Sequence, residues 1–149
     1  MKKYENFCRA LCNLEEIRDY REPYRTVELT GMVALYEICF EQSWKAMKEI
    51  LENDGFSEGK TGSPRMIMKT AFSAGMLKDE DVWMAALEAR NQATHAYNKA
   101  IALDIVNQTK ERFLPMFHEL KAEIDAIVND INIFTKRTNR GKPASRSAG

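Results

Sequence analysis

An arginine, a histidine and a tyrosine lie within eight residues of one another near the end of an expected helix. They are Arg90, His95 and Tyr97, and Asn91 is a polar neighbour. An imidazole can move a proton near neutral pH, and a guanidinium can hold two phosphate oxygens at once. The tyrosine adds a hydroxyl that could accept a modifying group. The set is suited to work on phosphodiesters, although a charge pair at a helix end would use the same residue types.

On an ideal helix, Arg90 and His95 would not share a face. Each residue turns a helix by about 100°, so five steps separate the two side chains by about 140°, whereas Arg90 and Tyr97 nearly eclipse. For Arg90 and His95 to meet on one phosphate, the helix must loosen after Thr94, or a second subunit must complete the site. A twofold axis near this helix end would satisfy the second condition. We therefore expect a homodimer with the Arg90–Tyr97 region in or beside its interface.

Apolar residues that recur every three or four positions predict the helices that carry this motif. Four main helices are expected, at about residues 3–20, 27–53, 79 to the motif, and 102–132. Short connections between long helices are typical of antiparallel neighbours. The sequence therefore predicts an all-α protein, an antiparallel up-down four-helix bundle with one short additional helix.

Individual residues mark where these helices should begin, bend or cross. Ser63 followed by Pro64 is a start signal for the short helix, which should run to about Ala74. Pro115 should kink or restart the fourth main helix. Gly31 lies inside the second helix at a cost in helix propensity, and it predicts a close helix crossing.

The charge of the chain is unevenly distributed. The 149 residues carry 22 basic and 22 acidic side chains, so no net charge draws the protein towards nucleic acid or membrane. Residues 136–149 hold five basic and no acidic side chains, which leaves a body with a charge of −5. We expect one helical domain over 1–134 and a basic, disordered tail over 135–149.

Several kinds of chemistry lack their signatures in this sequence. There is no glycine-rich phosphate loop and no HExxH motif, and Asp79 and Asp81, the two aspartates of Asp79-Glu80-Asp81, are read as the acidic start of a helix rather than as a metal pair. The chain is therefore not expected to be a nucleotidyltransferase itself. Cys8 and Cys12 lie one helical turn apart and could supply half of a metal site, but no second pair of ligands is placed to complete it. We expect no metal, no cofactor, no membrane segment and a cytoplasmic location.

A set of short motifs resembles the nucleotidyltransferase substrate-binding proteins of the HEPN superfamily. The motifs, in order, are Phe40-Glu-Gln-Ser-Trp44-Lys45, Ser63-Pro64-Arg65, Ala71-Phe72-Ser-Ala-Gly75, Trp83, and Arg90-Asn91-Gln-Ala-Thr94-His95-Ala-Tyr97-Asn98. The resemblance covers about residues 1–130. It implies a helical bundle that acts as partner or substrate-binding subunit of a separately encoded minimal nucleotidyltransferase, in a pair like a toxin–antitoxin module.

The resemblance also implies roles for single residues. Arg90 and His95, supported by Asn91, match the residues that give some superfamily members a metal-independent RNase activity. Tyr97 matches the tyrosine that partner nucleotidyltransferases adenylylate. The alternative function is therefore an endoribonuclease toxin silenced by adenylylation of Tyr97, with RNA as a further partner. Separately, Lys45 and Arg65 could bind a nucleotide phosphate, and solvated surface positions are the alternative for both.

Overall fold

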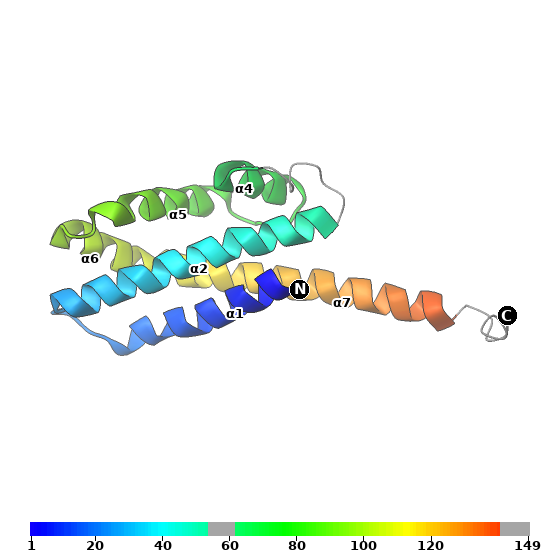
Figure 1. The fold of residues 1–149 in the computed structure, drawn as a ribbon, viewed down its shortest axis with the longest axis horizontal. Coiled ribbons are helices and arrows are strands. Elements are labelled where there is room, and N and C mark those ends of the chain that lie inside the picture. Colours follow the sequence, from blue (N-terminus) through cyan, green and yellow to red (C-terminus); the bar gives the residue numbers. More distant parts are fainter. Residues whose placement is uncertain (54–61, 141–149) are drawn as a thin grey trace.

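The computed structural model describes residues 1–53 and 62–140, and these form a bundle of helices (Figure 1). The helices are α1 (Lys2–Glu15), α2 (Thr26–Asn53), α4 (Pro64–Ser73), α5 (Glu80–Gln92), α6 (Lys99–Gln108) and α7 (Leu114–Arg140), with a 3-10 turn at Glu16–Asp19 after α1. Within the described ranges there is no β-strand. The first predicted helix thus ends as an α-helix at Glu15 and continues for one tighter turn.

The main helices run alternately up and down the bundle (Figure 1). Helix α1 lies beside α2, α2 also contacts α4, α5 and α6, and α1 closes the bundle against α7. Helices α6 and α7 together form the fourth main helix, and α4 is the short additional one. The predicted fold class is confirmed. The α5–α6 connection and the start of α2 lie at the same end of the bundle (Figure 1).

Side-chain caps fix where the inner helices begin. Ser63 accepts a hydrogen bond from the Met66 backbone N–H, and Pro64 follows at the first helical position. Asp79 caps α5 in the same way through the Val82 N–H. Each cap accepts a hydrogen bond from a backbone N–H of the first turn, which has no carbonyl partner within the helix. The two starts predicted from the sequence are therefore confirmed.

Aromatic rings gather at the centre of the bundle and hold the helices together. Tyr36 of α2 stacks on Phe113 with ring centroids 5.3 Å apart, and Trp83 of α5 meets Phe117 of α7 edge-on at 5.7 Å. Phe7 of α1 also meets Phe117, at 6.1 Å. All five side chains are at most 2% exposed. Large buried rings contribute strongly to such a core, so the core joins all four main helices.

The fourth main helix is interrupted near Pro115, as predicted. Residues Thr109–Phe113 form a wider π-helical turn between α6 and α7, and Pro115 lies in the first turn after it. Proline has no N–H to donate and its ring crowds the preceding turn, so a widened turn accommodates it. The chain otherwise passes continuously from Lys99 to Arg140.

The tail expected from residue 135 is partly wrong. Helix α7 continues to Arg140, six residues into that segment. No glycine or proline occurs between Pro115 and Gly141, so nothing in the sequence ends the helix earlier. Residues 141–149 lie outside the described residues.

Gly31 does not mark a close helix crossing within the chain. A Cβ atom at this position would meet no atom within 4 Å, and Gly31 lies on an exposed part of α2. Its helix propensity cost is thus not offset by tight packing within one chain. No helix among the described residues is long and apolar enough to cross a membrane.

Candidate functional site at the turn between α5 and α6

The motif residues lie where α5 ends and the chain turns into α6. Helix α5 stops at Gln92, and Ala93–His95 form a 3-10 turn. Asn98 caps α6, because its Oδ1 accepts hydrogen bonds from the backbone N–H groups of Ala100 and Ile101 at 3.0 and 3.3 Å. A cap residue needs extended backbone angles, so the chain must leave the α5 helix before Asn98.

The helix therefore loosens, as one of the two predicted conditions required, although it does so from Ala93 rather than after Thr94. The common face that an unbroken helix would give Arg90 and Tyr97 is lost with it. Arg90 and Asn91 remain on the regular part of α5, whereas His95 and Tyr97 lie in the turn that follows it.

Arg90 is held from the neighbouring helix α2. Its Nη2 lies 2.8 Å from Oε1 of Glu41, and its Nη1 donates to Oδ1 of Asn91 at 3.4 Å. The other oxygen of Glu41 accepts a hydrogen bond from the indole Nε1 of Trp44 at 3.0 Å. Glu41 thus links the guanidinium to an aromatic ring that packs against the core. The arginine side chain keeps about a third of its surface exposed (34%).

Glu41 is the site residue that sequence reasoning missed. It lies inside the Phe40–Lys45 run that supports the family resemblance, three residues before Trp44. That spacing places both side chains on one helix face and was the available signal. Nothing in the sequence could show that this face meets α5, because the contact joins positions 49 residues apart.

His95 and Tyr97 lie together at the tip of the turn. Their ring centroids are 6.3 Å apart and nearly perpendicular, at 76°. His95 is exposed, and Tyr97 exposes 88% of its side chain, the highest value among the large hydrophobic residues of the described chain. In the part of the chain described, no hydrogen bond joins Arg90 to His95. In the structure, His95 therefore lies beside Tyr97, whereas Arg90 is paired with Glu41 of α2.

The two predicted phosphate ligands lie outside this turn. Lys45 lies one turn beyond Glu41 on α2 and lines a hollow of about 300 Å³; the other lining residues are Lys3, Trp44, Lys48, Glu49 and Glu52. Arg65 is exposed on α4, where its Nη1 lies 3.8 Å from the sulfur of Met84. Helix α4 lies at the opposite end of α5 from the turn (Figure 1).

The second histidine has a partner that the sequence did not reveal. Nε2 of His118 on α7 lies 2.7 Å from Oε1 of Glu15 at the end of α1. Partial burial would raise the pKa of Glu15, but the hydrogen bond from His118 and the nearby Arg18 outweigh it and lower that pKa below 4.5. This pair joins the first and last helices. It is structural rather than part of the motif site.

No set of ligands for a metal ion is assembled in the described residues. Cys39 is buried, and burial raises the pKa of its thiol. Cys12 is exposed and Cys8 is half-buried. The chemistry that this turn offers is therefore that of an imidazole, a phenol and a held guanidinium.

Comparisons with known proteins bear on this arrangement. Residues 2–126 match the family described as "Nucleotidyltransferase substrate binding protein like". The chain belongs to this family. The match covers all the motifs at the turn, as well as Glu41 and Trp44 on α2.

Individual relatives agree with the family assignment. The chain is 27% identical over 82 residues to a probable ribonuclease HepT of Haemophilus influenzae; the match covers 54% of this chain and 56% of that protein, so it spans only about half of the relative.

Two solved structures share the fold. HI0074 of Haemophilus influenzae, described as having the fold of a substrate-binding domain of a nucleotidyltransferase, superposes with a TM-score of 0.70 at 21% identity, over 82% of this chain and 98% of that chain. The protein ttk003001694 of Thermus thermophilus gives a TM-score of 0.63 at 27% identity, over 80% of this chain and 96% of that chain.

Proposed function

We propose that this protein is the substrate-binding partner subunit of a separately encoded minimal nucleotidyltransferase, that the pair works in the cytoplasm, and that Tyr97 accepts the nucleotidyl group. The family description supports the pairing. One observation carries the role of Tyr97: its side chain is 88% exposed on a turn fixed by the Asn98 cap. At this exposure the phenol oxygen is accessible to the active site of a second protein. It is presented as a substrate would be.

The transfer is an ordinary phosphoryl substitution. The Tyr97 oxygen attacks the α-phosphorus of a nucleoside triphosphate bound to the partner, a new P–O bond forms, and the α–β bridging bond breaks. Pyrophosphate leaves, and the phenolic proton passes to a base in the partner's active site. Each adenylate adds a negative phosphate beside His95. Its charge and bulk would exclude a second phosphodiester from the turn.

Intact mass measurement after incubation with the partner and ATP tests this proposal. Wild-type protein should gain one adenylate, and Tyr97→Phe should gain none. Tyr20→Phe is the matched control, because Tyr20 is also exposed (43%) but lies outside the turn. Modification of Tyr97→Phe at the wild-type level would show that the acceptor lies elsewhere.

A second candidate function is a metal-independent endoribonuclease. It is favoured by the accessible imidazole of His95, by the guanidinium of Arg90 with Asn91 beside it, and by the relative named as a probable ribonuclease. His95 would remove the proton of a ribose 2′-hydroxyl, and that oxygen would attack the adjacent phosphorus. The 5′-oxygen of the next nucleotide would leave with a proton, and a 2′,3′-cyclic phosphate would remain. Arg90 would stabilise the charge of the phosphorane.

This second function sets a condition on Arg90. At least one N–H group of the Arg90 guanidinium must bind the phosphate instead of Glu41 or Asn91. Cleavage of RNA in EDTA that is lost in both His95→Ala and Arg90→Ala would support the enzyme. An absence of cleavage, together with adenylylation of Tyr97, would support the binding subunit alone.

We also propose that the protein forms a homodimer through an apolar stripe on α2 next to this site. Val27 and Ile38 expose 83% and 53% of their side chains, and Gly31 and Ala34 lie exposed between them. The 4-3-4 spacing is the same in both directions along the helix. An antiparallel twofold crossing would therefore place Val27 against Ile38 of the second copy, while the two small residues let the backbones approach.

The stripe leads directly to the motif site, because Glu41 follows Ile38 by one helical turn. A dimer through it would have Arg90 beside its interface. Sedimentation should show a dimer at micromolar concentration that Ile38→Glu converts to a monomer. Met66→Glu is the control, because Met66 is equally exposed (52%) but lies on α4. A wild-type monomer would refute this part of the proposal.

The phosphate-binding role of Lys45 and Arg65 is proposed as a minor one. Lys45 has the stronger support, because the hollow that it lines holds three lysines against two glutamates, Glu49 and Glu52, beside the Trp44 ring. Quenching of Trp44 fluorescence by ATP, reduced in Lys45→Glu, would support it. Equal quenching in Lys45→Glu and wild type would contradict it.

A further inference from the structure

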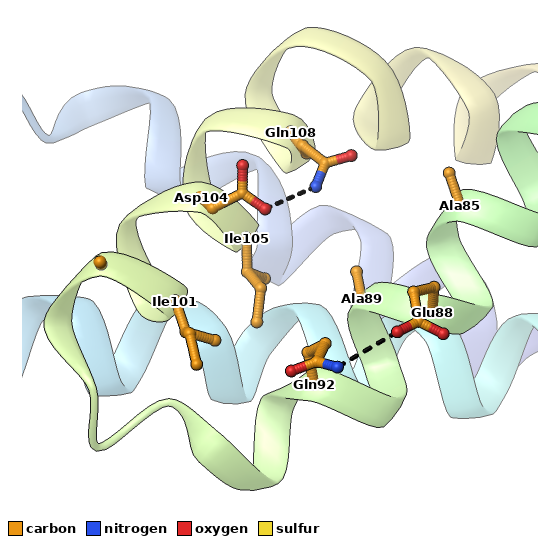
Figure 2. A pocket seen from close by; sticks show the side chains of 9 residues that line it. Ala85, Glu88, Ala89, Gln92, Ile101, Asp104, Ile105 and Gln108 are labelled. Carbon is orange, nitrogen blue, oxygen red and sulfur yellow. Dashed lines mark hydrogen bonds between the residues drawn. The ribbon is translucent and has the colours of Figure 1, made fainter.

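Helices α5 and α6 enclose a groove that the proposed chemistry does not use. It has a volume of about 420 Å³, and Figure 2 shows it between the two helices. Its floor is apolar and includes Ala85, Ala89, Ile101 and Ile105. Two alanines one helical turn apart allow another backbone to approach closely. The groove extends from Ala85 to Gln92 along α5, about 10 Å at 1.5 Å per residue, or two turns of a helix.

The rim of the groove carries two matched polar pairs, one on each helix (Figure 2). Gln92 donates to Oε1 of Glu88 at 3.1 Å, and Gln108 donates to Oδ2 of Asp104 at 2.8 Å. Both carboxylates are exposed, and the lining residues include no lysine or arginine. One cation lies at the far end of the rim, where Nη1 of Arg112 donates to Oε1 of Gln108 at 3.2 Å. Each amide holds its carboxylate in place without neutralising it. The rim therefore bears two negative charges. The carboxylate oxygens that do not bind the amides are available to accept hydrogen bonds from a ligand.

This charge decides which class of ligand fits. Neither Glu88 nor Asp104 forms an ion pair among the described residues, and two such carboxylates over an apolar floor repel the phosphates of RNA and of nucleotides. They favour a segment that brings an aliphatic side chain to the floor and basic side chains to the rim. Such a segment is an amphipathic helix of about two turns, with Lys or Arg on either side of a central Leu, Ile or Val.

We propose that the α5–α6 groove is the docking site for a basic amphipathic helix of the partner nucleotidyltransferase. This inference rests on the proposed function. At one end the groove is lined by Gln92 and Ala100, which flank the turn that carries Tyr97, so a docked partner would be held near the phenol it modifies. Tethering converts the transfer into an effectively intramolecular step. The groove thus supplies the recognition that one exposed tyrosine lacks.

Charge reversal on the rim provides the test. The double variant Glu88→Lys/Asp104→Lys should bind the partner nucleotidyltransferase at least tenfold more weakly in isothermal titration calorimetry. The control double variant Glu16→Lys/Glu111→Lys makes the same charge change at exposed positions outside the groove. It should change the affinity less than twofold. All four positions are exposed, and circular dichroism verifies that both variants are folded.

The outcomes separate the inference from the function on which it rests. Equal binding by wild type and the groove variant, with Tyr97 still adenylylated, would overturn the docking site and leave the proposed function intact. No binding and no adenylylation of wild type would overturn both. A change in self-association or in RNA binding that is confined to the groove variant, with partner binding unaltered, would assign the groove to a second copy or to RNA and overturn the inference.

Discussion

Replacing Glu41 by glutamine should loosen the hold on Arg90 while the bundle stays folded. In the wild type, one carboxylate pairs with the guanidinium at 2.8 Å and accepts the indole N–H of Trp44 at 3.0 Å. Glutamine keeps the shape and one carbonyl acceptor but removes the charge. The variant therefore isolates the ion pair from the packing of the side chain.

The expected cost follows from the exposure of the two groups. Their side chains are 34% and 31% exposed, so water screens the pair and its contribution is about 0.2–1 kcal/mol. Weakening the charge-assisted bond from the indole adds about 0.5 kcal/mol. Together they amount to about 1 kcal/mol, which lowers the melting temperature of a chain of this size by roughly 2–4 °C.

Thermal and urea unfolding of a double-mutant cycle with Arg90→Met would measure the pair itself. The coupling between the two positions should be positive and should shrink in high salt. Glu123→Gln is the control, because its ion pair with Lys78 is longer, at 3.2 Å, and its lysine is 62% exposed. Additive effects of Glu41→Gln and Arg90→Met, within about 0.3 kcal/mol, would refute the claim that Glu41 positions the arginine.

Three further predictions concern the turn, the core and the pH dependence of stability. Asn98→Ala should cost about 1 kcal/mol and speed amide hydrogen exchange at the start of α6, since its Oδ1 caps two backbone N–H groups; unchanged exchange there would contradict the cap. Tyr36→Phe should cost about 1 kcal/mol in urea unfolding, because the buried hydroxyl donates to the backbone carbonyl of Ala86; a neutral effect would show that this bond adds nothing to stability. The lowered pKa of Glu15 means that its pair with His118 stabilises the fold above pH 4.5 and that this stabilisation is lost as pH falls through the lowered value. The stability advantage of wild type over Glu15→Gln should therefore shrink in acid, by a few tenths of a kcal/mol because both side chains are at least a third exposed; a constant difference across the pH range would contradict the linkage.

The sequence by itself determined the helices and most of their ends. Apolar side chains every three or four positions require a helix if they are to share one buried face, and this local rule predicts α1, α2, α5 and the α6–α7 pair. A helix cap involves residues only three positions apart, so the starts of α4 at Ser63 and of α5 at Asp79 could be predicted from the local sequence. Pro115 was readable as a break, because it lacks a donor wherever it stands. The Arg90, His95 and Tyr97 candidates were visible from residue type alone.

Only the tertiary structure decided what these side chains meet. Glu41 holds Arg90 across 49 positions and Glu15 reaches His118 across 103, contacts that depend on which helix faces pack together. Gly31 looked like a crossing and lies exposed, because an absent side chain does not tell whether another helix fills its place. The acidic groove between α5 and α6 exists only when two helix faces are set side by side. Local periodicity fixes the elements, whereas long-range packing creates the sites between them.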